Sequence, residues 1–165
     1  MSRRPSAMDV ASPTVADVMI TRPKTLPSSG TTVAHVREMF DDDHVHMVLL
    51  TDEGVLRGTL VRGDLEAARD SPDPAPAMLF ATLRGRTIGP ADRIDQVQRE
   101  MVDEGLRRLA VVDDHGGLLG LLCLKRRRTG FCSDRDVAER AADRASGLSP
   151  PVRARRSGRR RGGPR

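Results

Sequence analysis

The sequence predicts an α/β protein built from two copies of one unit, and three observations lead to this prediction. First, the pattern of apolar residues that begins at Val33 returns sixty-one residues later at Ile94. Second, each copy opens with apolar residues at helical spacing and continues with two short apolar runs separated by a turn. Third, the chain of 165 residues has an ordinary globular composition, with 38% hydrophobic and 31% charged residues.

Each copy is predicted to begin with a short strand followed by an amphipathic helix. Val33, Val36 and Phe40 stand at i, i+3 and i+7, a spacing that places three apolar side chains on one helical face. The same spacing returns in the second copy at Ile94, Val97 and Met101. Thr25-Leu26 and Thr87-Ile88 precede the two helices at equivalent positions and are expected to form the short strands.

Two further strands and a second helix are predicted to follow in each copy. The apolar runs at 47–50 and 109–112 are short and bordered by charge, so they suit strands that are buried on both faces. Turn-like residues come next, and each turn leads into a second apolar run, 55–61 or 118–124. Each unit is therefore predicted to run strand, helix, strand, strand, helix.

The segments around the copies set the expected boundaries. Ser12-Pro13 is predicted to cap and open a short helix, with Pro at the first helical position, and Pro76 to open the matching helix. We expect a first repeat over 12–69, a linker over 70–76 and a second repeat over 77–146. Segments 1–11 and 147–165 are expected to be disordered, for lack of an apolar surface with which to dock.

Charge and composition exclude several classes of protein. Residues 151–165 hold seven arginines and no acid, whereas the first 150 residues are slightly acidic, so the net positive charge comes from a basic tail. No apolar run approaches the roughly 20 residues that span a bilayer, and no membrane partner is expected. Two cysteines, Cys123 and Cys132, are too few for a disulfide framework, and we interpret the chain as cytoplasmic. The scarcity of aromatic residues argues against a dedicated single-strand binder.

With the copies aligned, the sequence resembles the CBS domain, a module usually found in tandem. The similarity is carried by the stretches 15–26 and 106–122 and by the ordered repetition of the elements, and it covers roughly residues 12–143. The resemblance implies two pseudo-symmetric halves with a cleft between them, and a homodimer. It also implies AMP, ADP, ATP or S-adenosylmethionine as a regulatory ligand, with no cofactor required.

The resemblance further implies ligand-binding residues in the first copy. In this family an Asp after the second hairpin strand holds the nucleotide ribose, in the pattern Gly, apolar, any, Ser or Thr, two residues, Asp. Gly58 and Asp64 occupy the two ends of this pattern and are candidate binding residues. Val61 stands where a hydroxyl is expected, and an apolar side chain cannot bond a sugar or phosphate oxygen. This site is degraded or altered, and Asp64 has an alternative role as the cap of the next helix.

The second copy allows two registers of the same motif. By repeat alignment Gly120 opens it, which puts Cys123 at the hydroxyl position and Arg126 where Asp belongs. This half would then be defective.

In the other register the motif begins ten residues later. Gly130, Ser133 and Asp136 are then the candidate ligand-binding residues, and an insertion around 125–129 extends the strand into an Arg-rich loop. Ser133 and Asp136 also have the spacing of a helix capping box. A helix start offers backbone N–H groups to a phosphate, so both roles are compatible.

Two further clusters have the residue types of a binding site. Arg126, Arg127 and Arg128 are candidate phosphate contacts because each guanidinium presents a planar fork of donors, the alternative being a solvated loop. His44 and His46 follow three aspartates, but in the second copy the same positions are a helix end and the entry to a strand. No metal site is therefore predicted.

The sequence thus predicts a non-catalytic regulatory module. It would sense an adenine nucleotide or related adenosyl ligand in the cleft and pass its state to an effector protein. No catalytic residues are predicted, because no nucleophile elbow, phosphate loop or dinucleotide fingerprint is present. The alternative is a dimerising scaffold with a degraded ligand site, whose Arg-rich tail binds nucleic acid or an acidic partner.

Overall fold

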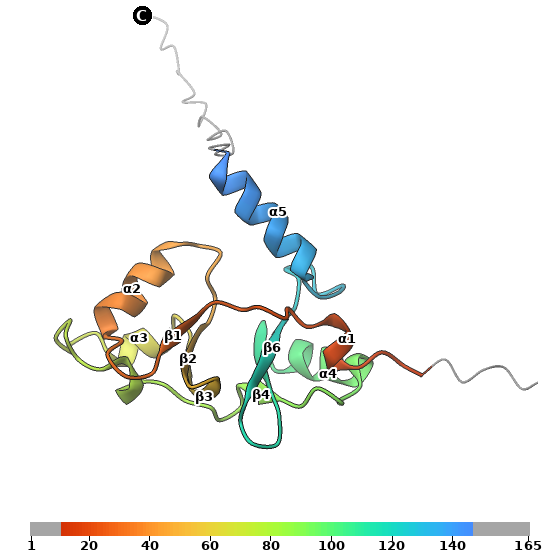
Figure 1. Ribbon diagram of the computed structural model, residues 1–165, viewed down its shortest axis with the longest axis horizontal. Helices are drawn as coiled ribbons and strands as arrows, with labels where there is room; N and C mark the ends of the chain where they lie inside the picture. Colours follow the sequence, from red (N-terminus) through yellow and green to blue (C-terminus); the bar gives the residue numbers. More distant parts are fainter. Residues whose placement is uncertain (1–10, 147–165) are drawn as a thin grey trace, which may run out of the picture. The chain divides into compact units, whose positions relative to one another are not determined.

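The computed structural model describes residues 11–146, and it divides after Asp134 into two units. The predictions made for 1–10 and 147–165, the Arg-rich tail among them, lie outside the described residues. The first unit, called the body below, contains these elements (Figure 1): α1 (Val15–Val18), β1 (Thr25–Pro27), α2 (Val33–Asp41), β2 (Val48–Asp52), β3 (Val55–Leu60), α3 (Asp64–Ala67), the 3-10 helix η1 (Ala77–Leu79), β4 (Thr87–Ile88), α4 (Ile94–Asp103), β5 (Arg108–Val112) and β6 (Leu118–Cys123). Helix α5 (Asp134–Ala145) lies almost entirely in the second unit.

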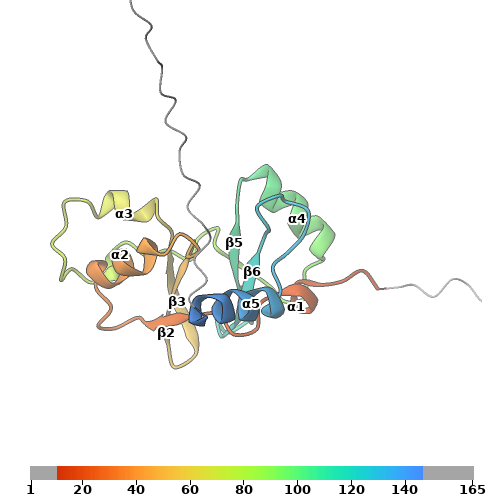
Figure 2. The ribbon, with the colours of Figure 1, turned by 90° about the horizontal axis from the view of Figure 1, so that it is seen from above.

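The body contains two sheets of three strands with the same topology. Their orders are β1-β2-β3 and β4-β5-β6, and in each the first pair is parallel and the second antiparallel. Leu49 faces Thr59 in the first sheet, and Leu109 faces Leu122 in the second. Figure 2 shows the two sheets as separate halves, each with its own helices. The prediction of an α/β fold made from two similar units is confirmed.

The helical faces read from residue spacing are the buried faces. In α2 the buried residues are Val33, Val36 and Phe40, and in α4 they are Ile94, Val97 and Met101. Each face packs on the apolar strands of its own sheet and forms a separate core. None of the helices within 11–146 combines the length and apolar character that a bilayer crossing needs.

The segment that opens each expected repeat packs on the opposite half of the body. Val15 of α1 belongs to the core of the second half, and Ile20 exchanges two backbone hydrogen bonds with Leu121 of β6, at 2.8 and 2.9 Å. In the same way, Thr82 exchanges two hydrogen bonds of 3.0 Å with Thr59 of β3. The expected boundaries at 12–69 and 77–146 follow the repetition in sequence. In space, these opening segments, called the leading segments below, pack on the other half.

Glycine allows these crossing segments to approach the sheets closely. A Cβ on Gly120 would lie 2.5 Å from the carbonyl oxygen of Ile20, and one on Gly58 would lie 2.6 Å from the Cβ of Ala81. Both distances are shorter than real Cβ contacts. Gly58, a candidate ligand residue by resemblance, therefore has a packing role that is repeated by its counterpart in the second half.

Two short helices begin later than the sequence suggests. Thr14, not Ser12, is the N-cap of α1, because the Asp17 carboxylate accepts a 2.8 Å hydrogen bond from the Thr14 amide. The Pro13 carbonyl meanwhile accepts from the Ile94 amide, which keeps Pro13 outside the helix. The helix expected after Pro76 forms a single 3-10 turn, η1. Its continuation is prevented by the strand pairing that begins at Thr82.

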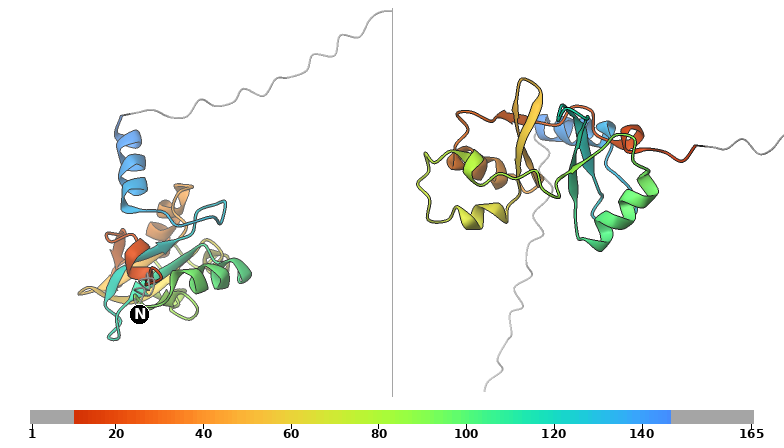
Figure 3. Two further views of the ribbon diagram at one scale, coloured as in Figure 1. Left: turned by 90° about the vertical axis from the view of Figure 1, so that its right-hand side faces the viewer. Right: turned by 90° about the horizontal axis from the view of Figure 1, so that it is seen from below.

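The two halves meet through a pair of equivalent hydrogen bonds at the hairpin turns. The Leu56 amide donates to the Gly116 carbonyl, and the Leu118 amide donates to the Gly54 carbonyl, both at 2.9 Å. Figure 3 shows the β2-β3 and β5-β6 hairpins side by side at this junction. Beside it lies a shared apolar cluster consisting of Met47, Leu49, Leu56 and Ala110.

Candidate functional site

A cavity of about 320 Å³ lies between the two repeats, at the ends of their central strands. This volume is within the usual range for a small-molecule site. The cavity is called the cleft below. Its lining residues come from the entries to β2 and β5, the exit of β3 and the residue before β4: His46, Met47, Val61, Arg62, Gly63, Arg86, Gly105, Leu106, Arg107 and Arg108.

The cleft is strongly cationic. Four of its ten lining residues are arginines, one is a histidine, and none of the ten is acidic. Guanidinium groups present planar forks of donors that match carboxylate and phosphate oxygens. The cleft therefore suits an anionic ligand.

Asp64, the first residue of α3, lies at the border of the cleft and binds Arg86. The two guanidinium nitrogens donate to the two carboxylate oxygens at 3.1 and 3.2 Å, and both side chains are about one-fifth exposed. The Val61 amide donates to Asp64 Oδ2 at 2.7 Å. The Val61 backbone N–H is thus bonded to Asp64, and it does not replace the ligand-binding hydroxyl that the sequence motif lacks.

The structure does not support the alternative role of Asp64 as a helix cap. The N-cap of α3 is Gly63, and the Asp64 carboxylate turns back to the end of β3. The sequence-predicted ligand residue therefore stands at the cleft, already paired with one of its arginines.

Backbone carbonyls orient the other arginines. The carbonyl oxygen of Leu124 accepts from Arg107 Nε at 3.2 Å and from Arg108 Nη1 at 3.4 Å. Arg62 Nη2 donates to the Asp42 carbonyl at 3.0 Å, and its guanidinium lies 5.3 Å from the centre of the Phe40 ring. Arg62 Nη2 also lies 3.9 Å from Oδ1 of the exposed Asp43, which offsets part of its charge. A carbonyl or an aromatic face, by contrast, holds a guanidinium in place without cancelling its full charge.

His46 responds to this positive charge. Partial burial lowers the pKa of the His46 imidazole, and the nearby cations Arg108, Arg107 and Arg62 lower it further, with a smaller effect from His44. Within residues 11–146, no group of three or more His, Cys, Asp or Glu side chains is placed to hold a metal. His46, weighed in the sequence as a metal ligand, instead lines the cleft.

The lowered pKa of His46 predicts that the folded state loses stability in mild acid. Below the ordinary histidine value of 6.5, His46 binds a proton in the unfolded chain before it does so in the folded protein. The unfolded state then holds more protons, so the free energy of unfolding falls as the pH drops from 6.5 toward the folded pKa. Urea midpoints measured between about pH 7.5 and pH 5.5 should fall less in His46→Gln than in the wild type.

His44→Gln is the matched control for this titration, because His44 is exposed to solvent two residues away. It should retain most of the wild-type dependence on pH, because His44 has the smallest of the effects that lower the pKa of His46. Identical slopes for His46→Gln and the wild type would contradict the cause assigned to His46.

The other sequence-predicted residues lie elsewhere. Arg126, Arg127 and Arg128 are exposed on the turn after β6 and are not among the ten lining residues. That turn is the predicted Arg-rich extension, closed by a hydrogen bond of 2.8 Å from the Lys125 amide to the Gly130 carbonyl.

Ser133 and Asp136 stand at the start of α5. Ser133 directly precedes the helix and Asp136 is its third residue. Asp136 belongs to the second unit and is therefore described apart from the cleft. Roles for Ser133, Asp136 and Gly130 in ligand binding remain predictions.

Sequence reasoning missed four cleft arginines: Arg62, Arg86, Arg107 and Arg108. One signal was present in the repeat alignment. His46 and Arg107 occupy equivalent positions, each at the entry to a buried central strand. Basic residues at the same position in both copies mark the end of the strands at which the halves face each other.

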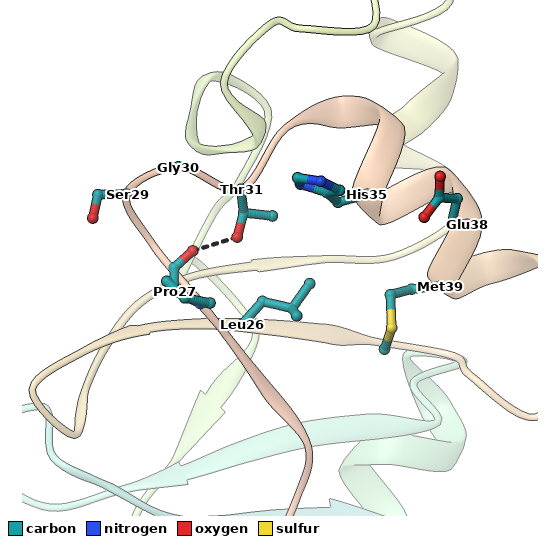
Figure 4. A pocket seen from close by; sticks show the side chains of 8 residues that line it. All are labelled: Leu26, Pro27, Ser29, Gly30, Thr31, His35, Glu38 and Met39. Carbon is teal, nitrogen blue, oxygen red and sulfur yellow. Dashed lines mark hydrogen bonds between the residues drawn. The ribbon is translucent and has the colours of Figure 1, made fainter.

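A second cavity, of about 530 Å³, lies within the first repeat beside α2 (Figure 4). Leu26 and Met39 give it an apolar surface, and His35 and Glu38 are its charged or titratable residues. The Thr31 hydroxyl, also part of the lining, donates to the Pro27 carbonyl at 2.6 Å. This cavity is larger than the cleft, but its lining contains no cluster of like charges and comes from only one repeat. The cleft is therefore the better candidate site.

Comparison with known proteins agrees with this geometry. The family model described as CBS domain matches residues 15–70 and 84–126, whereas a search of curated proteins finds no significant match. A CBS domain protein from Pyrobaculum aerophilum complexed with AMP is 21% identical with a TM-score of 0.57, covering 78% of this chain and 98% of that one.

Two further solved structures are similar. CBSX2 in complex with AMP is 20% identical with a TM-score of 0.58, over 79% of this chain and 98% of that one. A CBS domain pair in complex with 5-methylthioadenosine and S-adenosyl-L-methionine is 17% identical with a TM-score of 0.55, over 81% and 98%. Two matched repeats, two equivalent sheets and this shared fold lead to one conclusion: the chain belongs to the CBS domain family.

Proposed function

We propose that the protein is a non-catalytic regulatory module that binds an adenine nucleotide in the cleft between its repeats. The observation that carries the proposal is the convergence of four arginines and His46 on one cavity without an acidic lining residue. The adenosyl ligands of similar CBS structures support the adenine part of the proposal. The cationic lining supports the phosphate part.

In this proposal the Asp64–Arg86 pair recognises the ligand. An ionised carboxylate has about four acceptor positions, and three hydrogen bonds already reach Asp64. A ribose diol needs two acceptors, so Arg86 must release at least one oxygen when the sugar binds. The released guanidinium donor is then available to a phosphate. Binding of the nucleotide exchanges at least one hydrogen bond of the internal ion pair for contacts of Asp64 and Arg86 with the ligand.

This exchange links the ligand to the arrangement of the halves. Asp64 belongs to the first repeat, Arg86 precedes the first strand of the second sheet, and Arg107 and Arg108 enter its central strand. A ligand that contacts all of them stabilises one relative arrangement of the repeats. We propose that an effector protein reads this arrangement, and that the module acts as a homodimer.

Calorimetric titration of the full chain with adenosine, AMP, ADP, ATP and S-adenosylmethionine tests the proposal. We expect saturable binding of the nucleotides, with adenosine weaker because it lacks phosphate. S-adenosylmethionine should also be weaker, because its sulfonium is cationic. Higher salt should weaken nucleotide binding, as for any charged ligand in a partly exposed site.

Arg86→Gln and Arg57→Gln provide the matched pair for this titration. Arg57 is an exposed residue of β3 whose ionic partner, at 3.6 Å, is Asp52 near the hairpin turn. Arg86→Gln should reduce the preference for ADP over adenosine, and Arg57→Gln should keep it. Equal affinity for adenosine and ADP, or nucleotide binding that neither variant alters, would contradict the proposed site.

A further inference from the structure

The chain continues beyond β6 as a short hairpin that brings the two cysteines face to face. Phe131 pairs antiparallel with Leu124. The hydrogen bonds on either side of this pair run from the Lys125 amide to the Gly130 carbonyl and from the Cys132 amide to the Cys123 carbonyl, both at 2.8 Å. In this register the residue opposite Cys123 is Cys132.

Burial shows that the two cysteine side chains share one face of the hairpin. Leu124 and Phe131 pack together on the core of the second half. Side chains alternate along a strand, so Cys123 and Cys132 point to the other face. There they form one buried cluster with Ile20, and both are held as thiols.

The spacing at such a position is compatible with a disulfide. The bond from the Cys132 amide to the Cys123 carbonyl is one of the two that define a hydrogen-bonded antiparallel pair. The Cα atoms of such a pair lie about 5.5 Å apart, and disulfides span roughly 4.4–6.8 Å. Closing the bond therefore requires side-chain rotation and no large movement of the backbone.

We propose that Cys123 and Cys132 are a redox-active pair that closes to an intrachain disulfide when it meets a small-molecule disulfide such as oxidised glutathione. Cys132 is 6% exposed and Cys123 is 2% exposed, so Cys132 reacts first. Its thiolate attacks one glutathione sulfur, which forms a mixed disulfide and releases one glutathione thiolate. The Cys123 thiolate then attacks the Cys132 sulfur and releases the second. The two thiol protons go to the released glutathione thiolates through solvent, and the pair is oxidised by two electrons.

The disulfide would join the segment around Cys132 to β6. Hydrogen bonds to two other parts of the body lie next to this point. Leu124, next to Cys123, provides the carbonyl that orients Arg107 and Arg108. Asp134, two residues after Cys132, accepts hydrogen bonds of 2.8 Å from both the amide and the hydroxyl of Thr21. The oxidised form therefore restrains the edge of the second sheet.

Mass spectrometry of the native full chain incubated with oxidised glutathione tests the proposal. The wild type should lose the mass of two hydrogen atoms, pass through a transient glutathione adduct and return to the dithiol with dithiothreitol. Peptide mapping should join Cys123 to Cys132. The oxidised protein should also unfold at a higher urea concentration than the reduced protein, because the closed loop restricts the unfolded chain.

The variant Cys123→Ser is the control for the second step. It should accumulate the Cys132 glutathione adduct, because no second thiol is present to release it. A wild-type protein that keeps both thiols, that accumulates the adduct as the variant does, or that forms only disulfides between chains would overturn the proposal.

Discussion

Replacing Gly120 by alanine is expected to lower the free energy of unfolding by about 2–4 kcal/mol. The added Cβ would lie 2.5 Å from the Ile20 carbonyl oxygen and 2.7 Å from the Met19 sulfur. The flexible end of the methionine side chain can shift at low cost, but the carbonyl is fixed by the two hydrogen bonds between Ile20 and Leu121. Relief of the overlap therefore lengthens both bonds and lifts the leading segment from β6. Urea denaturation followed by circular dichroism measures the loss.

Gly63→Ala is the matched control for this substitution. A Cβ on Gly63 meets nothing within 4 Å, and the backbone already has helical φ and ψ angles of −63° and −28°. Alanine should therefore leave the urea midpoint close to that of the wild type. If Gly120→Ala unfolds at the same urea concentration as Gly63→Ala, the close approach of the leading segment to β6 is wrong.

Removing the Asp64 carboxylate is expected to weaken nucleotide binding by about 10- to 100-fold, the usual worth of hydrogen bonds to a charged group. Asp64→Ala deletes the acceptor proposed for the ribose and releases Arg86 from its bidentate partner. Adenosine should be affected as well as ADP, because both contain the ribose. Calorimetric titration with both ligands distinguishes it from the phosphate-dependent loss expected for Arg86→Gln.

Asp52→Ala controls for the change in net charge. Asp52 ends β2 at the hairpin turn, whereas the cleft lies at the entry to that strand, and the Asp52 side chain is 55% exposed. Its removal should leave both affinities unchanged. An Asp64→Ala protein that is folded and binds adenosine as the wild type does would exclude Asp64 as the ribose acceptor.

Local features of the fold could be predicted because they depend on residues close in sequence. The buried faces of α2 and α4 follow from apolar residues one turn apart, such as Val33 and Val36. The crossing of the leading segments could not be predicted in this way. The pairing of Ile20 with Leu121 joins residues a hundred positions apart, and nothing in the local pattern around Ile20 specifies its partner.

The candidate site could be predicted only in part, because some of its residues belong to a local motif and others meet only in the folded chain. Asp64 stands at the cleft as the family resemblance implies. Its partner Arg86 lies 22 residues away, directly before β4. Arg107 and Arg108 read as ordinary charged residues that border an apolar run. Their convergence with Arg62 depends on how the halves meet, which single-residue patterns do not encode.

The hydrogen-bonded junction at the hairpin turns has a consequence for folding cooperativity. Leu56 and Leu118 bind the turn of the opposite repeat, and each sheet edge is completed by a segment that leads into the other repeat. If one repeat unfolds, the edge strand of the sheet in the other repeat loses its hydrogen-bonded neighbour. The body should therefore melt in a single transition, with a urea m-value that reflects the surface of both repeats together.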